Sequence, residues 1–175
     1  DVPDASHPTL AAAIARLGGA RDDDVVWDPF VGAGLELVER ARLGPYASLL
    51  GTDTDDAALA AAKKNLDSAR VRDFTLARAD ARRHAPRGVT LVLTNPPMGR
   101  RVQSGKLDEL LVAFVDNVGR VLVRKGRFVW ITPRAATTNR ALERAGLRKT
   151  PNLVVAMRGF AANLHVLPDF HGNRS

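Results

Sequence analysis

The turn that begins with Asn95-Pro96-Pro97 carries residue types with an unusual chemical use. Pro97 has a fixed φ and biases Pro96 toward an extended backbone, so the peptide is stiff. The Asn95 amide and the Pro96 carbonyl then offer two acceptor oxygens at fixed places. A planar amine attached to a ring is a poor nucleophile, because its lone pair is delocalised. Two acceptors that bind its N–H bonds would direct that lone pair at an electrophile, so positioning would supply most of the catalysis.

A second turn with chemical potential covers residues 28–34, Asp-Pro-Phe-Val-Gly-Ala-Gly. Its two glycines let the backbone turn tightly and let a ligand approach it closely. A dinucleotide fingerprint would need a third glycine, and Leu37 occupies that position. A nicotinamide dehydrogenase is therefore the least favoured interpretation. The alternative to a ligand-binding turn is a tight turn that binds nothing.

Three acids, Asp28, Asp53 and Asp80, follow three successive predicted strands. Asp53 lies 19 residues after Gly34, where a carboxylate can accept hydrogen bonds from both hydroxyls of a ribose. Asp80 could accept a bond from an adenine amino group. Each acid alone could be an ordinary loop residue, and Asp55 or Asp56 is the better candidate for a helix N-cap. Together the three acids indicate a ligand that carries adenosine.

The elements that must position these residues alternate between short apolar runs and helical patterns. Strands are predicted at 25–27, 47–51, 74–77, 89–94 and 127–132, and helices at 33–43, 56–69, 107–122 with Gly126 at the end, and 134–145. Residues 153–157 and 163–167 read as an antiparallel hairpin joined through 158–160. The order predicts a single α/β domain with a doubly wound, mostly parallel, seven-stranded sheet and a C-terminal hairpin. In such sheets ligands bind at the carboxyl ends of the strands.

Composition narrows the function classes. The 175 residues contain no cysteine, which excludes a disulfide scaffold, a cysteine-zinc site and a thiol nucleophile such as pyrimidine-C5 methylation needs. The formal charge is +7, and residues 89–175 hold 14 basic and 5 acidic residues. This half would suit a nucleic acid, although solvated surface arginines would give the same count. The four histidines show no ligand spacing, so no metal is expected, and no apolar run suits a membrane span. We expect a cytoplasmic protein.

The motifs resemble a known family. Residues 28–34, 51–53, 79–81 and 95–97 resemble, in order, the motifs of class I S-adenosylmethionine-dependent methyltransferases that act on amines. Asn-Pro-Pro-x-Gly-x-Arg at 95–101 and Ser-His-Pro-Thr-Leu at 6–10 are most similar to the THUMP-associated RNA guanosine-N2 methyltransferases. The resemblance covers essentially the whole chain. It implies a Rossmann-like fold, S-adenosylmethionine as cofactor and a tRNA or rRNA substrate. It also implies that the chain, which begins at Asp1, is excised from a longer protein with an RNA-binding module.

The resemblance also implies residue roles. The backbone at Gly32 and Gly34 would lie against the methionine part of the cofactor, and Asp28 would orient this turn or contact the cofactor's amino group. Asp53 would bind the ribose with Thr54 beside the adenine. The remaining implied roles are Asp80 and the Ala81 amide on the adenine edge, His7 and Thr9 near the carboxylate end of the cofactor, Phe30 beside the cofactor, Asn95, Pro96 and Pro97 around the target amine, and Arg100 and Arg101 on flanking RNA phosphates.

Met98 departs from the family pattern, which has Tyr or Phe after Asn-Pro-Pro to stack on the extruded base. A thioether can still cover an aromatic ring, with about 0.3 to 1.5 kcal/mol of favourable contact, or Phe30 could supply the stacking. Two other substrates fit the same turn, the adenine N6 of DNA and a glutamine amide of a protein. A hypothesis from a different class of function is a non-catalytic RNA-binding domain that keeps the fold, and Met98 is the residue that best supports it.

Overall fold

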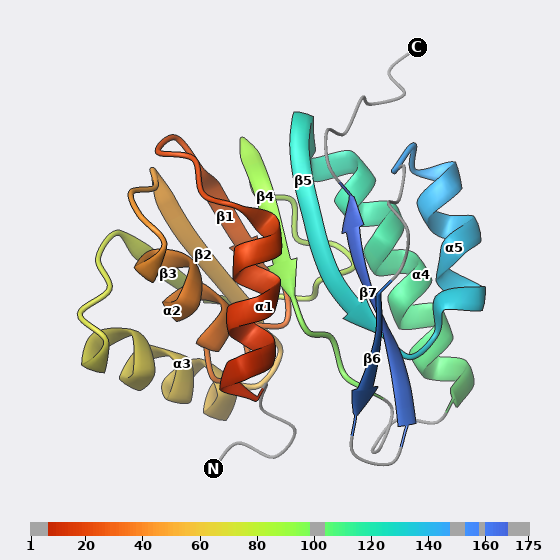
Figure 1. The fold of residues 1–175 in the computed structure, drawn as a ribbon, viewed down its shortest axis with the longest axis horizontal. Coiled ribbons are helices and arrows are strands. Elements are labelled where there is room, and N and C mark those ends of the chain that lie inside the picture. Colours follow the sequence, from red (N-terminus) through yellow and green to blue (C-terminus); the bar gives the residue numbers. More distant parts are fainter. Residues whose placement is uncertain (1–6, 99–103, 148–152, 158–159, 168–175) are drawn as a thin grey trace.

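The chain folds around a seven-stranded sheet with the strand order β3-β2-β1-β4-β5-β7-β6 (Figure 1). The computed structural model describes residues 7–98, 104–147, 153–157 and 160–167. The helices are α1 (Pro8–Gly18), α2 (Leu35–Arg42), α3 (Asp56–Ser68), α4 (Ser104–Val121) and α5 (Ala135–Arg144). The strands are β1 (Val25–Asp28), β2 (Ser48–Asp53), β3 (Phe74–Arg78), β4 (Val89–Thr94), β5 (Leu122–Thr132), β6 (Leu153–Met157) and β7 (Phe160–Leu167).

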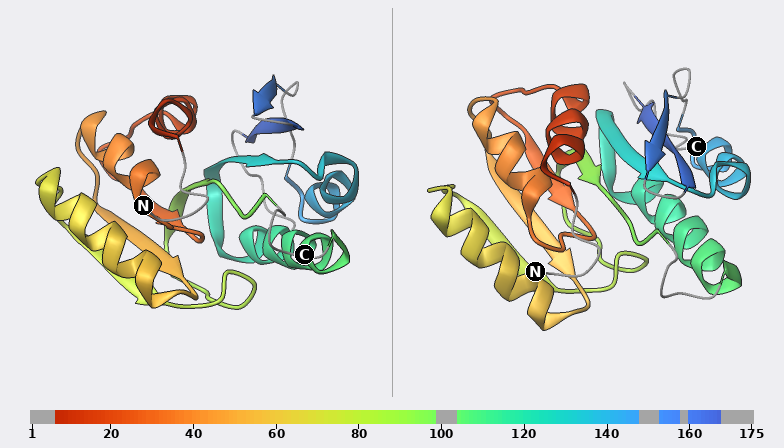
Figure 2. Two further views of the ribbon diagram at one scale, coloured as in Figure 1. Left: turned by 90° about the horizontal axis from the view of Figure 1, so that it is seen from below. Right: turned by 60° about the horizontal axis from the view of Figure 1, so that its bottom comes forward.

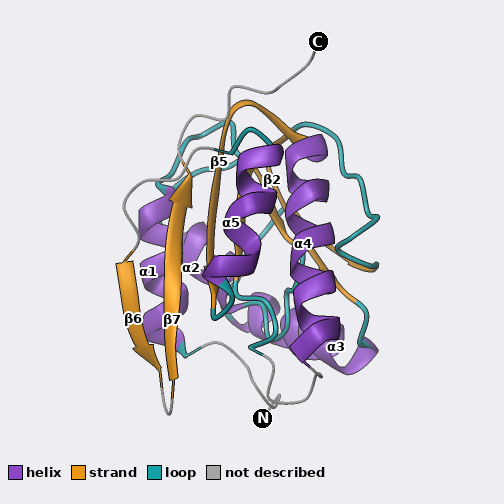
Figure 3. Cartoon of the chain, turned by 90° about the vertical axis from the view of Figure 1, so that its right-hand side faces the viewer, coloured by secondary structure: helices purple, strands orange, loops and turns teal. Residues whose placement is uncertain are grey.

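Strands β1 to β5 pair in parallel, whereas β7 runs antiparallel to β5 and β6 antiparallel to β7. The predicted doubly wound sheet with a C-terminal hairpin is therefore confirmed. Helices α1, α2 and α3 cover one face of the sheet and α4 and α5 cover the other (Figure 2). Figure 3 shows α4 and α5 side by side, where the ion pairs Asp108–Arg134 and Asp116–Arg144 join them.

The central strands are apolar on both faces because helices cover both. Successive side chains alternate between the two cores, as the period of a strand requires. Trp27 and Val92 pack with α4 and α5, whereas Val26, Leu91 and Leu93 pack with α1, α2 and α3. This double burial explains why 89–94 reads as an uninterrupted apolar run, and its predicted bounds agree with β4.

Several predicted boundaries were wrong; β7, for example, begins at Phe160 rather than residue 163. Two other differences have a clear local cause. Helix α2 begins at Leu35 rather than residue 33, because Gly34 adopts the left-handed conformation at its N-cap. The long helix ends at Val121 instead of Gly126, and β5 starts at the next residue. Leu122 pairs with Val89 before the register shifts. Gly126 thus lies inside the strand, where a Cβ atom would come within 2.7 Å of the Leu122 side chain.

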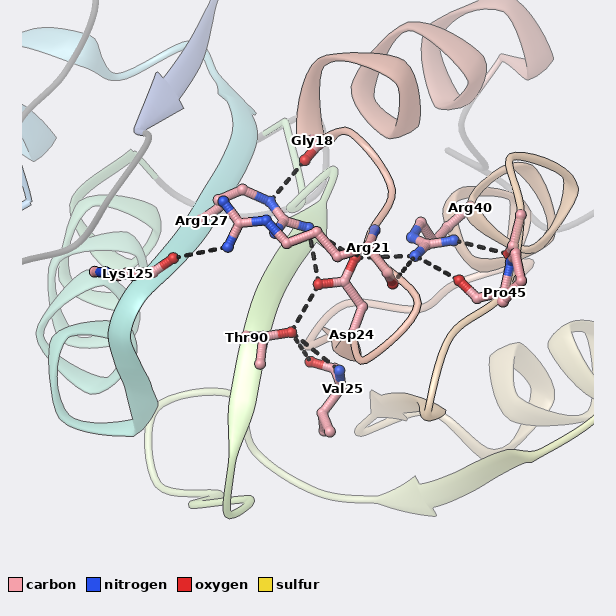
Figure 4. Close-up of polar contacts among 10 residues, drawn as sticks. Gly18, Arg21, Asp24, Val25, Arg40, Pro45, Thr90, Lys125 and Arg127 are labelled. Atoms are coloured by element: carbon pink, nitrogen blue, oxygen red, sulfur yellow. Dashed lines mark hydrogen bonds and ion pairs between the residues drawn. The ribbon is translucent and has the colours of Figure 1, made fainter.

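A cluster of buried charged residues connects the start of β1 to β4 and β5 (Figure 4). The fully buried Asp24 accepts hydrogen bonds from Arg40 at 2.9 Å, from Arg127 at 2.7 and 2.8 Å and from the Thr90 hydroxyl at 2.9 Å. Burial alone would raise the pKa of Asp24, but the bonds from Arg40, the Arg21 backbone and Arg127 outweigh it and the pKa is lowered. Arg127 belongs to the basic half of the sequence, but it is buried and its charge is paired with Asp24.

Candidate cofactor and catalytic site

The predicted site residues converge because hydrogen bonds tie four strand ends together. The Thr94 hydroxyl at the end of β4 donates to Asp28 Oδ1 at the end of β1, at 2.7 Å. The Gly32 amide donates to Asp53 Oδ2 at the end of β2, at 3.1 Å. The Ala79 amide, just after β3, donates to the Asp53 carbonyl at 2.9 Å. The turns singled out in the sequence therefore form one connected edge, to which β4 and β5 point in Figure 1.

The glycine turn between β1 and α2 is shaped by close packing. Gly32 and Gly34 have positive φ angles of 47° and 76°, which L side chains rarely adopt. A Cβ atom on Gly34 would lie 3.2 Å from Cα and Cβ of Ala62 in α3. Asn65, one turn further along α3, donates its amide to the Ala33 carbonyl at 2.9 Å. Helix α3 therefore packs closely against the glycine turn and holds its backbone.

Asp28 is fully buried at the centre of this edge. Its Oδ1 atom accepts from the Phe30 amide at 3.2 Å as well as from Thr94, so the carboxyl group holds both the glycine turn and the end of β4. Its Oδ2 atom is buried and has no hydrogen-bond partner among the described residues. Burial raises the pKa of Asp28 well above its ordinary value, and the nearby buried Glu36 raises it further. Sequence reasoning missed the contribution of Glu36.

Asp53 keeps acceptor capacity for a ligand. Each carboxylate oxygen accepts one backbone hydrogen bond, from Gly32 and from Asp55, both at 3.1 Å. A carboxylate has about four lone-pair sites, and Asp53 is half-buried with an exposed Thr54 beside it. Asp55 caps α3 by accepting from the Ala57 amide, so the prediction that Asp55 or Asp56 makes the cap is confirmed.

Asp80 forms an ion pair that sequence reasoning missed. Arg82 donates to both carboxylate oxygens, with contacts from 2.6 to 3.0 Å, and its own amide donates to Oδ1 at 2.9 Å. The bonds from Arg82 lower the pKa of Asp80. The carboxylate is therefore ionised and fixed in one orientation. The next residue, Ala81, is buried against the core beneath α4.

The Asn-Pro-Pro turn leaves β4 at the same edge. Asn95 is half-buried, Pro96 is buried and Pro97 is exposed. Met98 is half-buried and packs against the core under α1, α2 and α3. Phe30, the other candidate for stacking, packs on the opposite core with its ring edge-on to Phe114 at 5.0 Å.

The remaining predicted residues lie at the margin. His7 caps α1 by accepting from the Thr9 amide at 3.3 Å, and both side chains are exposed. Arg100 and Arg101 lie outside the described residues. Within the part of the chain that the structure describes, no group of three or more His, Asp or Glu side chains could hold a metal ion. In the same residues no helix has the length and apolarity to span a bilayer.

The strand order and the connected strand-end site define the class of protein, a Rossmann-like methyltransferase domain. The chain belongs to the family described as RMKL-like, methyltransferase domain (UPF0020), whose model matches residues 3–163. This agrees with the family predicted from the motifs.

Individual relatives support this assignment. The chain is 36% identical over 140 residues to a protein named tRNA (guanine(6)-N2)-methyltransferase from Thermus thermophilus, covering 77% of this chain and 42% of that protein. It is 28% identical over 134 residues to a tRNA (guanine(10)-N2)-dimethyltransferase from Methanothermobacter thermautotrophicus, covering 75% and 39%. The crystal structure of TrmN from Thermus thermophilus matches with a TM-score of 0.81 and 32% identity over 93% of this chain and 48% of that one. The chain therefore spans less than half the length of these relatives.

Proposed function

We propose that this domain transfers a methyl group from S-adenosylmethionine to an exocyclic base amine of RNA, with guanosine N2 of tRNA as the first candidate. The observation that carries the proposal is the Thr94–Asp28 hydrogen bond of 2.7 Å. It joins the end of β4, which leads into Asn95-Pro96, to the end of β1, which leads into the glycine turn. A cofactor held on the glycine turn would therefore lie next to the two acceptor oxygens predicted to hold the amine.

The residues present fit the proposed cofactor. Asp53 has free acceptor capacity for the ribose hydroxyls, and the Asp80 carboxylate, whose pKa is lowered, would accept from the adenine amino group. The buried Oδ2 atom of Asp28, which has no hydrogen-bond partner among the described residues, suits a cationic or hydrogen-bonding group of the cofactor. Gly32 and Gly34 would let its amino-acid part approach the backbone. When bound, the cofactor supplies a methyl group made electrophilic by the adjacent sulfonium.

The protein's part in the reaction is to orient the amine. Asn95 Oδ1 and the Pro96 carbonyl would accept the two N–H bonds, so that the nitrogen lone pair points along the line of transfer. A strong base is not needed, because the nitrogen becomes acidic only as its new bond to carbon forms. Pro96 is buried and Asn95 half-buried, which keeps water from competing for the two acceptors.

The relatives favour RNA over the other planar nitrogens. Two proteins matched over three quarters of this chain carry names that specify guanine N2 of tRNA. Adenine N6 of DNA, a protein glutamine amide and a non-catalytic RNA-binding domain are the competing outcomes of one experiment. The chain is incubated with cofactor carrying a labelled methyl group and with tRNA, rRNA, DNA or protein, and labelled RNA is digested to nucleosides.

The expected result is label in N2-methylguanosine of tRNA, at a rate that Asn95→Ala reduces by about 100-fold or more, since small losses of alignment cost that much. Cofactor binding by the Asn95→Ala variant, measured by calorimetry, should stay unchanged. Label found in DNA or protein alone would show that RNA is not the substrate. A chain that binds no cofactor would overturn the proposal.

A further inference from the structure

The loop between β3 and β4 carries two of the predicted adenine contacts, Asp80 and Ala81, yet it has no helix of its own. Residues 79–88 form turns and irregular backbone, although Ala81 is only 3% exposed. Buried backbone groups in such a loop need hydrogen-bond partners from elsewhere in the fold. The amides of Arg83 and His84 both donate to the Asp80 carbonyl at 2.9 Å, so the loop begins as a tight turn on Asp80.

Two side chains of α4 contact this turn, Asn117 through two short hydrogen bonds and Arg120 through one bond of 3.5 Å to the Arg82 carbonyl. Asn117 is 2% exposed and donates its amide to the Ala81 carbonyl at 2.8 Å and to the His84 carbonyl at 2.7 Å. Only the nitrogen end of an amide can donate, so two carbonyl partners fix its orientation. The Asn117 oxygen accepts from Arg120 at 3.2 Å. Asn117 therefore binds the turn immediately after Asp80 and again at its end.

The glycine turn is held in a similar way. Asn65 of α3 donates to the Ala33 carbonyl, which lies between Gly32 and Gly34. Each of the two turns thus has one asparagine behind it, contributed by a helix, and neither asparagine belongs to the residues predicted to touch the cofactor. The two turns would contact opposite ends of the proposed cofactor, the adenine and the amino-acid part.

We infer that Asn117 is a positioning residue for adenine recognition and that Asn65 is its counterpart for the amino-acid end. This inference rests on the proposed cofactor. Loss of Asn117 would leave the Ala81 and His84 carbonyls without their donor and let the turn move, so Asp80 would no longer meet the adenine amino group. Loss of Asn65 would shift the glycine turn and leave the adenine contacts in place. The two substitutions therefore predict opposite patterns of ligand preference.

The test compares three ligands by calorimetry on the unmodified chain and on Asn117→Leu and Asn65→Leu, which keep the branched shape and the number of heavy atoms and remove the donors. S-adenosylhomocysteine is the reference ligand. S-inosylhomocysteine replaces the adenine amino group by a carbonyl oxygen, which faces the Asp80 carboxylate unfavourably. 5′-Methylthioadenosine keeps the adenosine and lacks the amino-acid part. Each variant serves as the matched control for the other.

We expect the unmodified chain to prefer S-adenosylhomocysteine over S-inosylhomocysteine by about tenfold or more, as a charge-assisted hydrogen bond would give. Asn117→Leu should reduce this preference to about threefold or less. Asn65→Leu should keep the preference, lose about tenfold in affinity for S-adenosylhomocysteine and bind 5′-methylthioadenosine within about twofold of the unmodified chain. General destabilisation would weaken all three ligands alike and would not produce this crossed pattern.

An unchanged preference in a folded Asn117→Leu variant would overturn the inference. If that variant does not fold, Arg120→Ala provides the second test, because it keeps both bonds donated by Asn117 but removes the donor to the Asn117 oxygen and the bond of 3.5 Å from Arg120 to the Arg82 carbonyl. Arg120→Ala should lower the adenine preference by about twofold, and no change there would also count against the inference. Failure of the unmodified chain to bind S-adenosylhomocysteine would instead refute the proposed function.

Discussion

Gly34→Ala tests whether helix α3 shapes the glycine turn between β1 and α2. The substitution forces an L residue into φ 76°, which costs about 1 to 2 kcal/mol. The new Cβ atom would also lie 3.2 Å from both Cα and Cβ of Ala62. The helix backbone cannot yield easily, so overpacking adds about 1 to 3 kcal/mol. The free energy of unfolding should therefore fall by about 2 to 5 kcal/mol.

Gly88 provides a matched control, since its φ is 72° but a Cβ atom there would meet nothing within 4 Å. Gly88→Ala should lose only the backbone cost of about 1 to 2 kcal/mol and leave cofactor affinity unchanged. Urea unfolding gives both free energies, and calorimetry with S-adenosylhomocysteine gives the affinities, which Gly34→Ala should weaken by about tenfold or more.

Ala62→Gly added to Gly34→Ala supplies room for the new methyl group. The double variant should recover the packing part, giving a coupling energy of about 1 to 3 kcal/mol, although glycine in a helix itself costs about 1 kcal/mol. Equal losses in Gly34→Ala and Gly88→Ala, or a coupling energy near zero, would refute the argument that α3 defines this turn.

Two other variants test the buried carboxyl groups. Asp24→Asn should lower the free energy of unfolding by about 3 to 5 kcal/mol, because it leaves Arg40 and Arg127 with no buried counter-charge. The exposed pair Lys63–Asp67 is the control: Lys63→Ala should cost about 0.5 kcal/mol or less in urea unfolding. Asp28 has a raised pKa, so its contribution to stability is greatest below its unfolded pKa of about 3.9 and is lost as pH rises through the folded value. Asp28→Asn should therefore gain stability relative to the unmodified chain from pH 4 to pH 8, and a constant difference would contradict the raised pKa.

Local patterns in the sequence predicted the fold and the turns of the site. Strand and helix periodicities, the Gly32–Gly34 turn and the stiff Asn95-Pro96-Pro97 peptide depend on neighbours a few residues apart. The rule that ligands bind at the carboxyl ends of parallel strands then placed Asp28, Asp53 and Asp80 at one edge. Element boundaries were less accurate where backbone geometry overrode side-chain pattern, as at Gly34 and Gly126.

Only the tertiary structure decided which polar residues act inside the protein. Asp24 and Arg127 are 103 residues apart and no local pattern connects them, yet they form a buried ion pair. Asn117 lies 36 residues from the Ala81 carbonyl that it holds. Such pairings depend on which elements the folded sheet brings together, and periodicity describes one element at a time. The sequence therefore predicted where a ligand would bind, whereas long-range packing determined how the turns of the candidate site are held.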